Sequence, residues 1–123
     1  DILFIDSLHE ANHVKKLIYE YYPLIKVNGF IFIDDISHLP YLKNKERNNF
    51  YCEINNKETL DLLISIYSAN KENFDLNFAF LSSGLATIKK RTDEKLTIYK
   101  KINERSLSFK NILRKLWIKM KKN

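Results

Sequence analysis

Two short apolar runs that each end in aspartate constrain the fold of this chain more than any other feature. The first is DILFID at residues 1–6, and the second is FIFID at residues 30–34. Continuous apolar runs rich in Ile and Phe are typical of strands buried on both faces of a sheet. Asp6 and Asp34 are 28 residues apart, which is about the length of a βαβ unit. We therefore expect two parallel strands joined by a helix.

The segment between the two runs has a helical period. Apolar residues recur at the i, i+3, i+4, i+7 spacing of one helix face, which predicts a helix over residues 10–22. These residues are Val14, Leu17, Ile18 and Tyr21. The dipeptide Asn28-Gly29 then predicts a turn directly before the second run.

The middle of the chain predicts a loop and a second helix. Residues 35–55 are polar and irregular, which indicates a loop or a short helical insertion. Residues 57–69 predict a helix, for which Asn55 or Asn56 is the expected N-cap.

Two further strands are expected to close the sheet as an antiparallel hairpin. Residues 75–81 and 85–90 are strand-like and flank the turn Ser82-Ser83-Gly84. Residues 96–102 are compatible with either a strand or the start of a helix. The expected fold class is therefore α/β, with parallel strands closed by an antiparallel pair.

The positive charge of the chain is concentrated at its C-terminal end. The net charge is +6, and seven basic residues but no acid occur from Arg105 onward. Residues 1–104 therefore have a net charge of −1, with 14 basic and 15 acidic groups. A domain without a basic excess is a poor candidate for binding nucleic acid, so we expect no nucleic-acid partner.

The basic end predicts an amphipathic helix that begins at Ser106 as N-cap. Its apolar stripe comprises Phe109, Ile112, Leu113, Leu116, Trp117 and Met120. Two interpretations of residues 105–123 stay open. The apolar stripe docks on the sheet or on a partner subunit of a homo-oligomer, or the helix makes peripheral contact with an anionic membrane.

The single cysteine and the lengths of the apolar runs bear on the cellular setting. Cys52 alone excludes an internal disulfide and a cysteine-based zinc site, and it fits a reducing cytoplasmic environment. No apolar run reaches the ~18 residues that a membrane span requires.

Acidic side chains follow both of the first two predicted strands. Asp6 ends the first strand, and Asp34 and Asp35 end the second, at the sheet edge where ligands bind in open α/β folds. Carboxylate oxygens suit Mg²⁺, which lowers the pKa of a coordinated hydroxyl. His9, three residues after Asp6, is a candidate proton acceptor at the same edge. Taken singly, an aspartate at a strand end is more often a turn former.

A zinc hydrolase is an alternative interpretation of the same region. Residues 9–13, HEANH, match H-E-x-x-H, which holds zinc through two histidines when it lies on one helix, with Glu10 as base. The preceding strand instead places His9 in a turn. The metzincin extension is also missing, because Lys16 and Tyr19 occupy the positions that require glycine and histidine.

The quoted runs resemble the second half of a class I S-adenosylmethionine (SAM)-dependent methyltransferase. The group concerned carries D-x-x-F-I-D-G-x-H on its fourth strand and includes metal-dependent sugar and macrolide O-methyltransferases. The sequence FLSSGLATIKK at residues 80–90 is similar to the closing strand pair of that family. The resemblance covers about residues 1–91 and implies a Rossmann-like methyltransferase fold there. Residues 92–123 form a basic amphipathic tail.

The resemblance implies specific roles for the residues of the first two strand ends. Asp6, Asp34 and Asp35 match the metal ligands, and His9 matches the proposed general base. Asp6 and Ser7 match the cofactor-binding positions, although Ser7 replaces a glycine of the family.

The implied activity is metal-assisted O-methylation of a sugar or another small hydroxylated acceptor, with SAM and Mg²⁺ as cofactors. A glycine-rich cofactor loop and a ribose-binding acid, which belong to the first half of such enzymes, do not occur in these residues. We therefore expect this chain alone to bind SAM weakly or not at all. A non-catalytic half-domain for assembly or membrane attachment is the alternative.

Overall fold

The computed structural model describes residues 1–8, 10–99 and 105–122. The strands are β1 (Ile2–Ile5), β2 (Phe30–Asp34), β3 (Phe74–Ala79) and β4 (Leu85–Lys90). The helices are α1 (Ala11–Tyr21), α2 (Phe50–Ala69) and α3 (Phe109–Lys122). Short 3₁₀ turns occur at Tyr22–Leu24, Leu39–Tyr41 and Arg105–Leu107.

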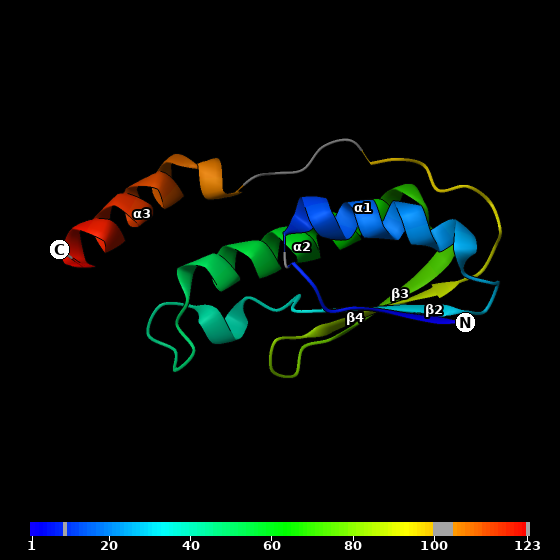
Figure 1. The fold of residues 1–123 in the computed structure, drawn as a ribbon, viewed down its shortest axis with the longest axis horizontal. Coiled ribbons are helices and arrows are strands. Elements are labelled where there is room, and N and C mark those ends of the chain that lie inside the picture. Colours follow the sequence, from blue (N-terminus) through cyan, green and yellow to red (C-terminus); the bar gives the residue numbers. More distant parts are fainter. Residues whose placement is uncertain (9, 100–104, 123) are drawn as a thin grey trace.

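The four strands form one mixed sheet in the order β1-β2-β4-β3 (Figure 1). β1 pairs with β2 in parallel, and the register places Ile5 opposite Ile33. β4 lies between β2 and β3 and is antiparallel to both. The structure thus confirms the parallel β-α-β opening and the closing hairpin, and it adds that the second hairpin strand is the inner one.

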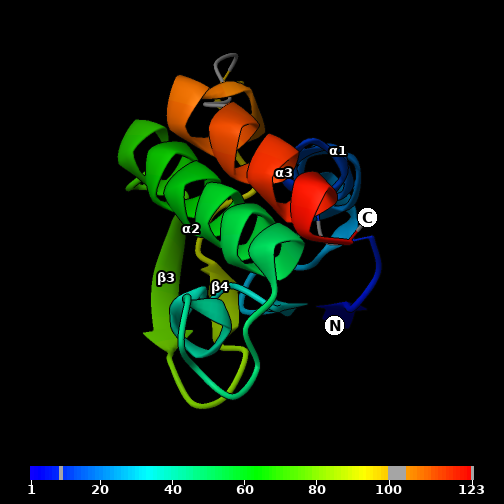
Figure 2. The same ribbon diagram turned by 90° about the vertical axis from the view of Figure 1, so that its left-hand side faces the viewer.

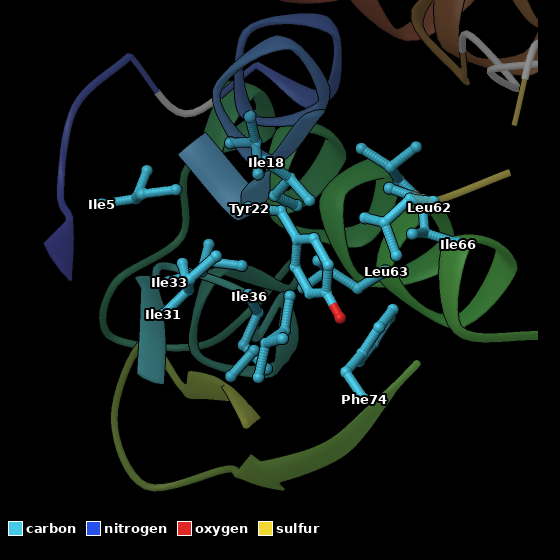
Figure 3. Close-up of a cluster of buried hydrophobic side chains, with 14 of the residues drawn as sticks. Ile5, Ile18, Tyr22, Ile31, Ile33, Ile36, Leu62, Leu63, Ile66 and Phe74 are labelled. Carbon is cyan, nitrogen blue, oxygen red and sulfur yellow. The ribbon is translucent and has the colours of Figure 1, made fainter. Parts of the chain in front are cut away.

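Helices α1 and α2 cover one face of the sheet, and the core lies between them and the strands (Figures 1 and 3). Alternate strand residues such as Ile31 and Ile33 point into this core and are fully buried. Figure 3 labels Ile5, Ile18, Tyr22, Ile31, Ile33, Ile36, Leu62, Leu63, Ile66 and Phe74 among the buried side chains. The sheet and the two helices therefore form two packed layers, and the strand ends that carry the candidate site lie at the edge of this core.

The opposite face of the sheet carries a row of aromatic side chains. The Phe4 ring lies 6.4 Å from that of Phe32, and Phe32 stacks on Phe30 with centroids 6.0 Å apart. No helix of the described residues covers this face in Figures 1 and 2. In the edge strand β1, Ile2 and Phe4 are 73% and 56% exposed. An apolar, unpaired edge of this kind favours association with another strand.

The helix predicted over residues 10–22 is present as α1, but its C-terminal end differs from the expectation. The sequence assigned Tyr21 to the buried stripe, whereas the structure exposes Tyr21 and buries Tyr22. Pro23 lies in a 3₁₀ turn that follows α1 directly, and the tighter turn changes the helical phase. The Tyr22 hydroxyl donates a hydrogen bond to the Asn73 carbonyl over 2.8 Å.

The turn before β2 forms as expected. Asn28 adopts a positive φ of 66°, which asparagine tolerates better than most residues. Gly29 is required for close packing, because a Cβ there would lie 2.5 Å from the Ile25 side chain and 2.9 Å from the Lys26 carbonyl oxygen.

The second helix is longer than predicted. α2 begins at Phe50 rather than at residue 57, and its N-cap is Asn49 rather than Asn55 or Asn56. The Asn49 side chain accepts hydrogen bonds from two backbone N–H groups of the first turn, those of Tyr51 and Cys52. Asn56 lies inside the helix, where it is buried and donates to the Ser37 carbonyl over 2.9 Å.

Residues 92–99 run back over α1 and α2 in an extended, irregular course. Thr97 exchanges two hydrogen bonds with the Asn70 side chain, of 2.7 and 3.1 Å. The Tyr99 backbone N–H donates to the Tyr19 hydroxyl. Residues 96–99 are neither strand nor helix, and the rest of the predicted 96–102 element lies outside the described residues.

The C-terminal helix α3 starts at Phe109, two positions after the 3₁₀ turn that contains Ser106. The Asn111 backbone N–H donates to the Ser108 hydroxyl, so the cap lies at Ser108 and not at the predicted Ser106. Figures 1 and 2 both show α2 between the sheet and α3. The apolar stripe of α3 therefore does not dock on the sheet. Within the described ranges, no helix is long and apolar enough to cross a bilayer.

Candidate functional site

The C-terminal ends of β1 and β2 meet at one edge of the sheet. Ile5 and Ile33 are register partners, and Asp6 and Asp34 are the residues that follow them. The predicted neighbourhood of the two strand ends is thus present. Asp6 and Ser7 are exposed, whereas Asp34 and Asp35 are half-buried.

The Asp34 carboxylate is engaged in a local turn. Its Oδ1 accepts a hydrogen bond of 2.8 Å from the backbone N–H of Asp35 and a longer one of 3.4 Å from the Ser83 hydroxyl. Asp35 has a positive φ of 58°, a backbone angle that aspartate adopts more readily than most residues. Asp34 therefore shapes the exit from β2, in addition to any role toward a ligand.

Asp35 lies next to the loop that leads into α2. Burial, and secondly the charge of the Asp35 carboxylate, raise the pKa of the Tyr41 phenol. The same two causes, in the same order, raise the pKa of the Cys52 thiol. Both groups therefore stay protonated at neutral pH, and Tyr41 presents a neutral hydroxyl near the second carboxylate.

The β3–β4 turn lines a second side of the site, which was not expected from the sequence. The Ser37 backbone N–H donates to the Ser83 carbonyl over 2.6 Å. Gly84 has a φ of 81°, and a Cβ at this position would lie 2.8 Å from that of Ser37. The Arg47 guanidinium donates to the Ser82 hydroxyl over 2.8 Å. The sequence predicted the turn Ser82-Ser83-Gly84 itself. Its contact with the segment after β2 was not predicted, because this contact requires that β4 lies beside β2.

His9, the predicted general base, lies outside the described residues. The nearby His13, on the first turns of α1, lies with its Nε2 atom 3.1 Å from the Ser7 hydroxyl. This contact ties the start of α1 to the segment after β1.

The zinc alternative requires the whole H-E-x-x-H motif on one helix, and the structure contradicts this. Glu10 is the extended N-cap residue of α1, with φ −105° and ψ 133°, so the helix begins only at Ala11. Glu10 therefore precedes the helix, so the motif does not lie on one helix as the zinc interpretation requires.

The predicted magnesium triad is not formed as a ready-made site. Among residues 1–8, 10–99 and 105–122, no three or more His, Cys, Asp or Glu side chains are grouped so that they could hold a metal ion. The Asp34 carboxylate instead accepts a hydrogen bond from the backbone N–H of Asp35. These carboxylates do not fit a preformed three-ligand metal centre.

His38 is a titratable residue that the sequence analysis did not single out. Its Nδ1 atom is buried and has no hydrogen-bond partner among the described residues. Burial, followed by the charge of Lys57, lowers its pKa, so the imidazole is neutral at pH 7. His38 lies directly before the 3₁₀ turn at Leu39–Tyr41, which packs against α2.

Comparison with known proteins gives a likeness in fold. No protein-family model matches the chain, and no curated protein matches its sequence. Among solved structures, the SAH-bound methyltransferase PaMTH1 of Podospora anserina superposes with a TM-score of 0.53 at 18% sequence identity. The match covers 75% of this chain but only 42% of PaMTH1, so the chain spans less than half the length of that enzyme. The chain thus has an α/β fold whose mixed four-stranded sheet resembles part of the Rossmann-like fold of a SAM-dependent methyltransferase.

Proposed function

We propose that these residues form the acceptor-side half of a SAM-dependent O-methyltransferase. The observation that carries the proposal is the superposition of the mixed sheet on part of an SAH-bound methyltransferase. A second line of support is the position of Asp6, Ser7, Asp34 and Asp35 at the C-terminal edge of the parallel strand pair. Ligands of open α/β sheets bind at this edge.

The side chains at this edge fit the charged end of the cofactor. When bound, SAM supplies an electrophilic methyl group on a sulfonium that carries a positive charge. Asp6 and Ser7 offer a carboxylate and a hydroxyl to the cationic methionine end. The chain's two glycines are Gly29 and Gly84, and neither lies in the segment directly after β1 or β2. A glycine-rich loop is therefore absent from these residues, and tight cofactor binding would need contributions from other residues.

The acceptor would lie between the two strand ends and the loop after β2. We propose a sugar or another small polyhydroxylated compound, on the strength of the sequence resemblance. Asp35 and the neutral Tyr41 hydroxyl offer hydrogen bonds that would orient its hydroxyl groups. His9 is proposed to accept the proton of the reacting hydroxyl. The proposal does not include Mg²⁺, because the carboxylates of the described residues form no grouped metal site.

A non-catalytic assembly module is the second candidate. The exposed apolar edge of β1 favours it, because Ile2 and Phe4 offer a strand-pairing surface to further structure. The two candidates differ in whether the strand ends recognise the cofactor at all.

Titration of the chain with millimolar SAH, followed by the NMR signals of backbone amides, separates the candidates. The methyltransferase proposal predicts weak binding with shifts at Asp6, Ser7, Asp34 and Asp35. Asp6→Asn should remove these shifts, whereas the matched control Asp75→Asn, at the opposite end of the sheet, should keep them. An absence of shifts at the strand ends would overturn the proposal and favour the assembly module.

A further inference from the structure

The basic side of α3, and not its apolar stripe, holds the helix on the protein. Arg114 forms a two-point interaction with Glu53 of α2, with distances of 2.8 and 3.2 Å, and both side chains are largely shielded from solvent. The Arg114 guanidinium also lies 4.7 Å from the centroid of the Phe50 ring. Lys115 makes a similar contact with Tyr51 at 5.6 Å. α3 is therefore docked through charged groups.

The apolar stripe of α3 faces solvent on the opposite side. Phe109 and Met120 are 78% and 75% exposed, and the other members are also exposed. The remaining members of the stripe are Ile112, Leu113, Leu116 and Trp117. At 100° per residue, Arg114 and Ile118 lie about 130° and about 170° from the middle of this stripe. A surface helix normally buries such a stripe, so this arrangement leaves a contiguous apolar surface for a partner.

Lysines border the apolar stripe on both sides. On the helical wheel, Lys110 and Lys121 lie along one border, and Lys119 lies along the other. No acidic residue occurs from Arg105 to the end of the chain. Lys121 lies 4.0 Å from the centroid of the Trp117 ring at the edge of the stripe. The surface is thus apolar in its middle and positive at its borders.

A groove of about 610 Å³ extends the positive border onto the body of the domain. It lies between α3 and the residues that precede and begin α2. Lys43, Lys110 and Trp117 line it, together with Arg114 and the Glu53 carboxylate that pairs with it. Lys43 also lies 5.7 Å from the Trp117 ring, so the loop before α2 adds positive charge beside the stripe.

We propose that α3 is a docking surface for an anionic lipid bilayer. The apolar stripe would enter the boundary between headgroups and acyl chains, while the bordering lysines would reach the anionic headgroups. A second copy of the chain is a poorer fit. Two stripes packed face to face would bring lysine borders together with no acid on either helix to neutralise them. The proposal is independent of the methyltransferase function.

Vesicle co-sedimentation with the whole chain tests the proposal. We expect binding to vesicles of equimolar phosphatidylcholine and phosphatidylglycerol, and at least about tenfold weaker binding to phosphatidylcholine alone. Added salt should weaken the binding to anionic vesicles. Trp117 is the single tryptophan of the chain, so its fluorescence should shift to the blue as it leaves water.

Matched variants assign the effect to the stripe. Leu116→Glu should reduce binding to anionic vesicles by at least about tenfold, because it places a negative charge in the middle of the apolar stripe. Leu81→Glu is the control, since Leu81 is 86% exposed at the β3–β4 turn and lies far from α3 in sequence. Circular dichroism checks that both variants are folded.

Three results would overturn the proposal. The first is vesicle binding by Leu116→Glu that equals wild type, and the second is equal binding of wild type to neutral and anionic vesicles. The third is a wild-type dimer in light scattering that Leu116→Glu converts to a monomer, which would assign the stripe to a contact between copies.

Discussion

Replacing Gly84 by alanine tests whether the β3–β4 turn must lie against the segment after β2. Gly84 has a φ of 81°, and an added Cβ would lie 2.8 Å from the Cβ of Ser37 and 2.9 Å from its backbone nitrogen. Neither neighbour is the end of a flexible side chain. Alanine therefore meets two obstacles, an unfavourable backbone angle and a steric overlap, at the wall of the candidate site.

The expected cost follows from these two terms. A left-handed conformation costs a non-glycine residue about 1–2 kcal/mol. Overpacking against backbone typically costs about 1–3 kcal/mol, and partial movement of the turn would relieve some of it. We expect a total of about 2–4 kcal/mol, and a Tm lower by roughly 8–16 °C. A domain of this size has a free energy of unfolding of roughly 6–18 kcal/mol, so the variant should still fold.

Thermal and urea unfolding followed by circular dichroism measure this cost. Asn44→Gly is the matched control, because Asn44 also has a positive φ of 71° but lies exposed in the loop before α2. It should change the free energy of unfolding by no more than about 0.5 kcal/mol. A Gly84→Ala protein with the Tm of wild type would refute the close approach of the turn to Ser37.

Three further predictions concern pH, cofactor and association. Burial, and secondly the Asp93 carboxylate, raise the pKa of Tyr22 from its usual 10.0 to about 12, with Lys90 and Asp93 as the charged groups nearest to it. The neutral phenol therefore stabilises the fold fully below pH 10, and this stabilisation is lost as the pH rises toward 12. The free energy of unfolding should fall by about 2–3 kcal/mol over this range. Tyr22→Phe should flatten that part of a curve of Tm against pH. Calorimetry should show no micromolar affinity of this chain for SAM. A micromolar affinity would refute the expectation that tight SAM binding needs residues outside this chain. Phe4→Lys should lower self-association in light scattering, because it places a charge on the exposed face of an edge strand, and unchanged association would exclude β1 as the contact.

The local pattern of the chain predicted the elements whose signals are short-range. The runs at residues 1–6 and 30–34 became β1 and β2, and alternate residues such as Ile5 and Ile33 are buried under the helix between them. The expected burial on both faces is wrong for β1, because Ile2 and Phe4 are exposed. Asn28 took the positive φ expected of the turn. The hairpin strands also formed close to their predicted bounds, since a Gly-containing turn separates two strand-like runs.

The errors came from contacts that join distant segments. The start of α2 was missed because Asn49 caps it at a polar stretch, and Phe50 and Ile54 are buried there against the rest of the protein. The docking of α3 was not predictable from its amphipathic pattern, because the helix contacts the protein through the Arg114–Glu53 pair and not through its apolar stripe. The spacing of apolar residues predicts strands but not their order in the sheet, so it did not predict that β4 lies between β2 and β3.

Asp34 shows that a residue can match a metal-binding motif and yet have a structural role. Asp34 matched a metal ligand by sequence, yet its Oδ1 accepts the Asp35 N–H over 2.8 Å and thereby stabilises the turn. Asparagine can accept the same hydrogen bond without a charge, whereas alanine cannot.

The pair Asp34→Asn and Asp34→Ala therefore separates the two roles of Asp34. We expect Asp34→Asn to keep the Tm of wild type and Asp34→Ala to lose about 1 kcal/mol, with no Tm increase on adding Mg²⁺ to any of the three proteins. A wild-type Tm that rises with Mg²⁺ and loses this response in Asp34→Asn would restore the magnesium site, because only a ligand that binds the folded state stabilises it. Equal losses in both variants would show that the charge of Asp34, and not its acceptor oxygen, stabilises the strand end.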